Sequence, residues 1–346
     1  MDFFLIPAVI LVLAGGKIFP PGKTDPEPFA ISKTRAVCGL CTLLVFYRHM
    51  GQYLDLDGAH DQIFAAVDSF LRQAIVVPYL FFSGYGITVQ ILRKGQAYVR
   101  SIPRKRVLKI WLHFALAVLL FVLLNRALSI EYDPLETALA FTGWTDVGNS
   151  NWYIFTILVL YLMTWLAFRL VRNTEAAAWA LALFASLYFT IVYPWTSAQW
   201  YSTGAVYPLG VLFAVYGERI TEKIRKDSRY AVLGAGAALL AGIGSVLLLG
   251  AVAEDWSGWY NLPAALAALC MAFLLYKVSV GNKVLDFLGK YMFEIYILQR
   301  LPMIAFSGLG WDPYVYVLAS MAATFLLAVV FRAFTDLLDG RIRAFH

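Results

Sequence analysis

Long apolar segments separated by short polar loops make up most of this chain. A helix that crosses the hydrocarbon core of a membrane needs about 20 predominantly apolar residues. Applied along the sequence, that length predicts about ten spanning helices. The predicted spans are residues 36–51, 73–93, 107–126, 152–171, 176–193, 203–217, 231–253, 258–278, 288–308 and 314–335. The pattern therefore predicts an all-α polytopic membrane helix bundle.

A further apolar segment lies at the N-terminus, at residues 3–14. It is short for a span, so we expect either a marginal extra crossing or an interfacial helix. A cleaved signal peptide would begin with basic residues, whereas Asp2 precedes this apolar run, so we expect the segment to be retained. The chain then divides into residues 1–31, an N-terminal apolar segment and polar linker, and residues 32–346, one membrane domain.

Composition excludes a water-soluble fold. Of the 346 residues, 61% are hydrophobic and 14% are charged, compared with about 25% charged in a typical soluble domain. The net charge of +6 resides in short Lys and Arg runs beside apolar segments rather than on one amphipathic face. This placement predicts contact with membrane lipids and no nucleic-acid partner.

The loops alternate between basic and acidic, which indicates how the chain is oriented. Short cytoplasmic loops are enriched in Lys and Arg. Basic residues concentrate in every second loop, around residues 93–109, 169–172, 219–229, 277–290 and 332–343, and the intervening loops are acidic or nearly neutral. We therefore expect a multi-pass protein of the cell membrane (plasma or inner) with the basic loops cytoplasmic.

Ionisable residues inside a span are costly and often functional, and the first span contains Arg48 and His49. On an ideal helix Arg35 and His49 lie within about 40° of one face and about 21 Å apart. This spacing suits an anionic cytoplasmic donor, such as a coenzyme A thioester, and a hydroxyl acceptor from the opposite side. His49 would be the general base. The alternative is that His49 only bonds at a helix end while Arg48 reaches the lipid headgroups.

Three other features have both a structural and a functional interpretation. His113, in the third span, either faces the same cavity or forms a hydrogen bond with a neighbouring carbonyl. We favour the hydrogen bond, which is the structural interpretation. The aromatic and small residues at 78–86 are typical of close helix packing. The basic run 100–109 either binds the phosphates of coenzyme A or is an ordinary cytoplasmic loop.

The sequence predicts neither a metal site nor a disulfide. Cys38, Cys41 and Cys270 lie in apolar stretches, where a thiol usually packs as a small hydrophobic group. The Cys38–Cys41 pair has the spacing of a metal or redox motif, but no second Cys/His pair follows it. We therefore expect no metal and no cofactor, with acyl-CoA as a donor substrate.

The order of several short motifs resembles the acyltransferase 3 family of multi-pass membrane acyltransferases over residues 32–335. The matching blocks are Arg48-His49, Phe81-Phe82-Ser83-Gly84-Tyr85, Arg104 with Arg106, Asn151-Trp152-Tyr153, and Leu288 to Gln299. The resemblance implies a ten-helix fold that transfers acyl groups, most often acetyl, from cytoplasmic acyl-CoA to glycan hydroxyls, with His49 catalytic. The residues expected to bind acyl-CoA and substrate are Arg35, Ser83, Gly84, Tyr85, Arg104, Arg106, Trp152 and Tyr153.

The chain departs from the family pattern at two positions. Many members have Arg eleven residues before the histidine, where this chain has Cys38, and Arg35 is the candidate replacement. Many members have His at the position of Gln299. We expect acyl-CoA, a glycan or lipid-linked sugar acceptor and membrane lipids as partners. The alternative hypothesis is a transporter or flippase of a polar lipid or solute, although no internal repeat of hydropathy supports one.

Overall fold

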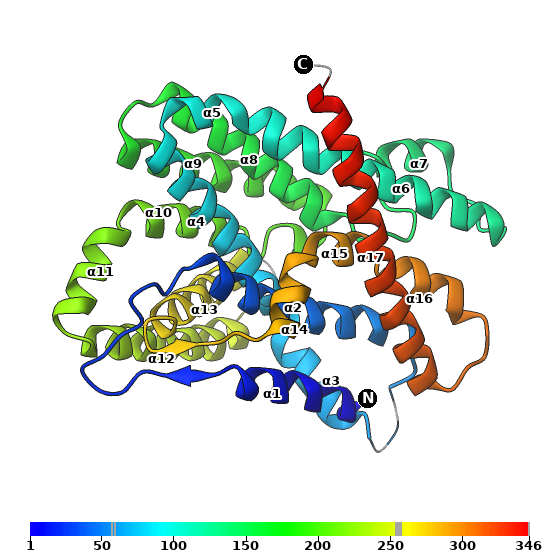
Figure 1. The fold of residues 1–346 in the computed structure, drawn as a ribbon, viewed down its shortest axis with the longest axis horizontal. Helices are drawn as coiled ribbons and strands as arrows, with labels where there is room; N and C mark the ends of the chain where they lie inside the picture. The colour runs from blue at the N-terminus through cyan, green and yellow to red at the C-terminus, as the bar shows by residue number, and fades with distance from the viewer. Residues whose placement is uncertain (57, 59, 253–257, 345–346) are drawn as a thin grey trace.

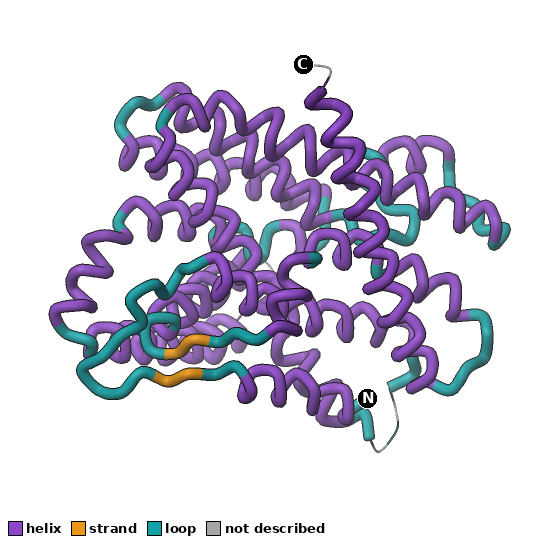
Figure 2. Tube along the Cα trace, viewed as in Figure 1, coloured by secondary structure: helices purple, strands orange, loops and turns teal. Residues whose placement is uncertain are grey.

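The protein is described by a computed structural model that covers residues 1–56, 58, 60–252 and 258–344. It is a bundle of helices, and its described part has one two-stranded ribbon (Figures 1 and 2). The α-helices are α1 Leu5–Ala14, α2 Ile31–Met50, α3 Gln62–Leu71, α4 Val77–Lys94, α5 Gln96–Ile102, α6 Lys109–Ala127, α7 Pro134–Ala140, α8 Trp152–Leu170, α9 Thr174–Val192, α10 Val206–Val215, α11 Gly217–Lys226, α12 Arg229–Val252, α13 Asn261–Leu274, α14 Lys283–Lys290, α15 Met292–Leu298, α16 Arg300–Ser307 and α17 Pro313–Ala344.

Shorter elements connect or extend these helices. Single turns of 3₁₀-helix are η1 Asp2–Phe4, η2 Gly51–Tyr53, η3 Arg72–Val76, η5 Tyr193–Trp195, η6 Ala198–Trp200 and η7 Gly258–Tyr260, and η4 Pro103–Leu108 is a π-helical turn. The ribbon pairs β1 (Lys17–Ile18) with β2 (Val278–Ser279) in antiparallel register.

Six helical segments of the described chain are long and apolar enough to cross a membrane, and several shorter apolar helices accompany them. The six are 73–94, 96–127, 152–170, 174–195, 229–250 and 313–340. Leu233, Leu240 and Leu247 of α12 are exposed along its length, as expected for a face in contact with lipid. The predicted all-α polytopic membrane bundle is thus confirmed.

The ninth expected span, residues 288–308, is not one continuous helix. It is formed by the end of α14, by α15 and by α16. The backbone of Tyr291 leaves helical dihedral angles at φ −103° and ψ 14°, which separates α14 from α15. Pro302, near the start of α16, has no N–H for the bond to residue 298. The third expected span is longer than predicted, because α5 continues through η4 into α6.

The N-terminal segment runs beside α2 in the opposite direction. At its start the Met1 ammonium pairs with Asp61, in the loop after α2. At its end the Gly15 carbonyl accepts a bond of 3.1 Å from Gly281, just before α14, and β1 then pairs with β2. At 10 residues, α1 is about 15 Å long. With η1 and residues 15–16 it extends between loops at opposite ends of α2.

Two close helix contacts without side chains between them hold the centre of the bundle. A Cβ on Gly39 of α2 would lie 2.1 Å from the Leu285 carbonyl oxygen of α14, and one on Gly289 would lie 1.9 Å from the Arg35 carbonyl oxygen. In the same way, a Cβ on Gly84 of α4 would meet the backbone of α10, and a Cβ on Gly210 of α10 would meet the backbone of α4. Only glycine permits backbones to approach this closely. These contacts fix α2 and α4, the helices that carry most of the candidate site.

Candidate functional site

A polar cavity lies between α2, α4, the η4 turn, α8 and the α14–α15 segment. Its larger part has a volume of about 680 Å³ and its smaller part about 350 Å³. Both parts are lined by Tyr79, Ser83, Arg106, Tyr161, Gly289 and Met292, so they adjoin each other. The Gly39–Gly289 contact, by bringing α14 against α2, forms one wall of this space.

The cavity wall is rich in cations, and several of them lack an acidic partner. Lys94, Lys105 and Arg106 line the larger part and have no carboxylate partner among the described residues. Arg106 donates from Nε to the Tyr98 hydroxyl at 3.1 Å, and Lys94 lies 5.9 Å from the centre of the same ring. Arg106 is half-buried and the two lysines are exposed, and this unpaired positive charge suits an anionic ligand.

Other cations of the cavity wall are already paired. Arg35 donates to Asp286 of α14 at 2.9 Å. Arg332 lies 3.9 Å from Glu294 and 3.8 Å from Asp336. These pairs tie α2 and α17 to the α14–α15 segment and leave fewer free donors on that side of the cavity. The cations of the cavity wall without an ion pair among the described residues are Lys94 of α4, Lys105 and Arg106 of η4, and Lys290 of α14.

His49 lies in the last turn of α2, beyond the tyrosines at the end of the cavity. Its ring centroid is 6.3 Å from that of Tyr296, and Tyr296 lines the cavity. The buried Nδ1 of His49 has no hydrogen-bond partner in the described chain. Arg48 is paired with Asp68 at 2.7 Å. His49 itself lines neither part of the cavity, and no hydrogen bond at the helix end accounts for its Nδ1.

His113 faces the cavity rather than a backbone carbonyl. It lines the smaller part, and its Nε2 lies 3.4 Å from Asp339 of α17. Lys109 contacts the other oxygen of the same carboxylate at 2.5 Å. The sequence favoured a purely structural histidine, whereas the structure gives His113 a carboxylate partner at the cavity wall.

The remaining predicted residues fall into two groups. Arg35, Ser83, Arg106 and Tyr153 line the cavity. The others do not line it: Gly84 is packed against the α10 backbone, Tyr85 lies among Phe29, Phe81 and Phe213, Arg104 is exposed, and Trp152 packs beside Tyr153. The rotation of each helix about its axis, which is set by packing, separates the two groups.

Sequence reasoning did not single out Tyr79, Tyr161 or Tyr296 as site residues. All three line the cavity, and the rings of Tyr79, Tyr153 and Tyr296 follow one another at 6.1 and 5.5 Å. Tyrosines are frequent throughout the chain, so no single one is conspicuous. The only available signal was that Tyr296 lies within the Leu288–Gln299 block.

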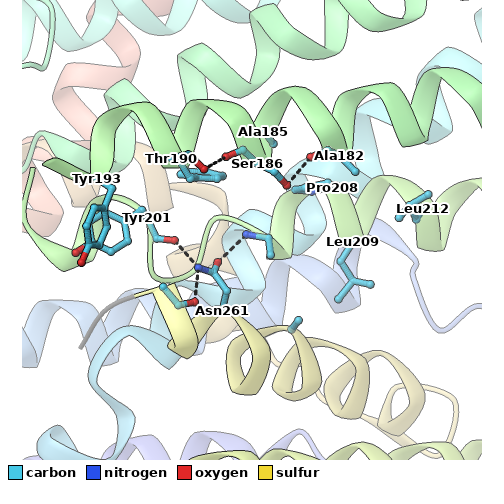
Figure 3. Close-up of a pocket in the computed structure, with 14 residues that line it drawn as sticks. Ala182, Ala185, Ser186, Thr190, Tyr193, Tyr201, Pro208, Leu209, Leu212 and Asn261 are labelled. Carbon is cyan, nitrogen blue, oxygen red and sulfur yellow. Dashed lines mark hydrogen bonds between the residues drawn. The ribbon is translucent and has the colours of Figure 1, made fainter. Parts of the chain in front are cut away.

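A second cavity, of about 760 Å³, lies between α9, α10 and α13 (Figure 3). Among the residues that the structure describes, no charged one lines it. Its main polar groups already bond to the backbone: the Asn261 amide donates to the Tyr201 carbonyl at 2.8 Å and accepts from the Ala205 N–H at 3.0 Å, and Ser186 and Thr190 bond within α9. Its remaining surface is mostly apolar, so the cation-lined cavity is the better candidate for polar chemistry.

The fold and the site together define a multi-pass membrane protein with an internal cavity suited to an anionic ligand. The family model described as an acyltransferase domain matches residues 38–333. The chain therefore belongs to the acyltransferase 3 family, as the motifs suggested, and is a membrane acyltransferase. No curated protein and no solved structure matches the chain at a significant level.

Proposed function

We propose that this protein transfers an acyl group, in the first instance acetyl, from acyl-CoA on the cytoplasmic side to a hydroxyl of an extracytoplasmic or lipid-linked glycan. The observation that carries the proposal is the arrangement of a cation-lined cavity that ends at tyrosines next to a histidine whose Nδ1 is buried. Arg106, Lys105 and Lys94 supply the positive charge, and His49 lies in the last turn of α2.

The donor fits the cavity by charge. Coenzyme A carries a diphosphate and a further phosphate on its nucleotide, and guanidinium and ammonium groups bind phosphates strongly. The basic residues belong to loops predicted to be cytoplasmic, where acyl-CoA is available. The thioester then extends past Ser83 and Tyr153 toward Tyr296 and His49, and the acceptor hydroxyl arrives from the opposite face.

His49 acts as the general base. It takes the proton of the acceptor hydroxyl as the oxygen forms a bond to the thioester carbonyl carbon. When the C–S bond breaks, the proton passes from His49 to the leaving thiolate, so that an ester and free CoA result. The groups needed for this reaction are all side chains of this protein, and no cofactor or metal enters the proposal.

The proposal is tested with the purified protein in lipid, supplied with radiolabelled acetyl-CoA and an extract of surface glycans and lipid-linked sugars. We expect base-labile label in the glycan fraction, and slow hydrolysis of acetyl-CoA without acceptor. Movement of a labelled sugar or lipid across the membrane without consumption of acetyl-CoA would contradict the proposal and support the transporter hypothesis.

Arg106→Gln is expected to raise the KM for acetyl-CoA by about 10- to 100-fold. A hydrogen bond to a charged group contributes about 1.5–3 kcal/mol, and about 1.4 kcal/mol corresponds to a factor of ten. Arg100→Gln is the matched control, because Arg100 belongs to the same basic run but is exposed and does not line the cavity. Equal KM values for the two variants would remove Arg106 from the donor site.

A further inference from the structure

Three buried polar atoms without hydrogen-bond partners lie on α2 and on the α15 segment that packs against it. They are Nδ1 of His49, the hydroxyl oxygen of Tyr296 and Oε1 of Gln299, none of which has a hydrogen-bond partner among the described residues. Tyr296 is 9% exposed and Gln299 is fully buried. An unsatisfied buried polar group costs about 1–3 kcal/mol, and such groups call for an explanation such as a catalytic role.

The N-terminus of α8 is directed at the same place. The side chain of Asn151, the N-cap residue, makes no capping bond to α8 and instead donates to the Gly143 carbonyl at 3.2 Å. The first N–H groups of a helix have no partner within the helix, and the positive end of the helix dipole lies there. The ring of Tyr153, the second residue of α8, lies 5.5 Å from the ring of Tyr296, measured between centroids.

Tyr296 thus occupies the position that joins the cavity to His49. Its ring lies 5.5 Å from that of Tyr153 and 6.3 Å from that of His49, measured between ring centroids. It lines the cavity through which the donor would enter. The proton of its hydroxyl has no acceptor among the described side chains and carbonyls, so it is available to a bound ligand.

We propose that Tyr296 is a catalytic residue, whose hydroxyl donates a hydrogen bond to the carbonyl oxygen of the acyl group during transfer. This inference rests on the proposed function. As the acceptor oxygen bonds to the carbonyl carbon and His49 takes its proton, the carbonyl electron pair moves onto oxygen. The Tyr296 hydroxyl stabilises that oxyanion, and the positive end of the α8 dipole lies on the same side of the cavity. The C=O bond then re-forms, the C–S bond breaks, and the thiolate receives the proton from His49.

The test is Tyr296→Phe, which keeps the ring and removes only the hydroxyl. Loss of one oxyanion donor lowers kcat by about 10²–10³-fold, and we expect that loss with little change in the KM for acetyl-CoA. Tyr188→Phe is the matched control. Tyr188, on α9, is also 9% exposed with an unpartnered hydroxyl in the described chain, and it lines neither part of the cavity.

The outcomes separate this inference from the proposed function. If the wild type and Tyr188→Phe transfer acyl groups and Tyr296→Phe retains kcat within about threefold of the wild type, the role of Tyr296 is wrong while the proposed function stands. A change confined to KM would also overturn it, because a transition-state donor acts on kcat. If the wild type transfers no acyl group, both proposals fail. Chromatography and thermal unfolding of each variant verify that the comparison is made between folded proteins.

Discussion

His49→Ala is expected to lower the rate of acyl transfer by about 10²–10⁴-fold, the range that a general base contributes. His49 lies next to Tyr296, the residue that links it to the cavity. Of the four histidines in the sequence, it alone combines a place in α2 with a buried, unpartnered ring nitrogen in the described chain. The measurement is kcat with saturating acetyl-CoA.

His60→Ala is the control for this loss. His60 lies in the loop after α2, and its ring packs in a tilted arrangement against the ring of Phe3, at 5.5 Å between centroids. It lines neither part of the cavity. The His60→Ala protein should transfer acyl groups at the wild-type rate. A His49→Ala protein that elutes and unfolds like the wild type but retains more than about a tenth of its kcat would exclude His49 as the base.

Gly84→Ala is expected to weaken folding strongly. The new Cβ would lie 2.2 Å from the Tyr207 carbonyl oxygen of α10, and the atom it meets is backbone, which cannot turn aside. Overpacking of this kind costs about 1–3 kcal/mol and occasionally more. The measurement is the yield of monodisperse protein in detergent and its unfolding temperature.

Gly86→Ala provides a matched comparison two residues along the same helix. A Cβ at Gly86 meets no atom within 4 Å, so this variant should fold, and its stability should equal or slightly exceed that of the wild type, because Ala favours the helix. Equal unfolding temperatures for the two variants would show that α4 and α10 do not pack through Gly84.

The hydrophobic pattern was sufficient to predict most of the bundle. Apolar runs such as 152–171 and 176–193 correspond closely to α8 and α9, because a membrane-spanning helix must be apolar over nearly all of its length. The broken ninth span was not predicted, since the break falls at Tyr291, an aromatic residue that does not by itself indicate the end of a helix. The path of α1 beside α2 depends on contacts with loops distant in the sequence, which no local pattern contains.

The candidate site was predicted in part, for reasons of geometry. Arg104 and Arg106 are equivalent in the sequence, yet one is exposed and the other lines the cavity, because the helix points their side chains in different directions. His49 was found because an ionisable residue in an apolar span is unusual. Tyr296 was not, because tyrosine is common in this chain and its importance lies in its position between the cavity and His49.

The most direct test of the central claim is to count two products in one sample of the purified wild-type protein in lipid, supplied with labelled acetyl-CoA and the acceptor extract. The thiol released and the base-labile acetyl ester formed are measured together, beside His49→Ala. The proposed function predicts one ester for each thiol above the slow hydrolysis, and neither product from His49→Ala above background. Thiol release that is independent of His49, or ester formation that does not follow thiol release, would contradict it.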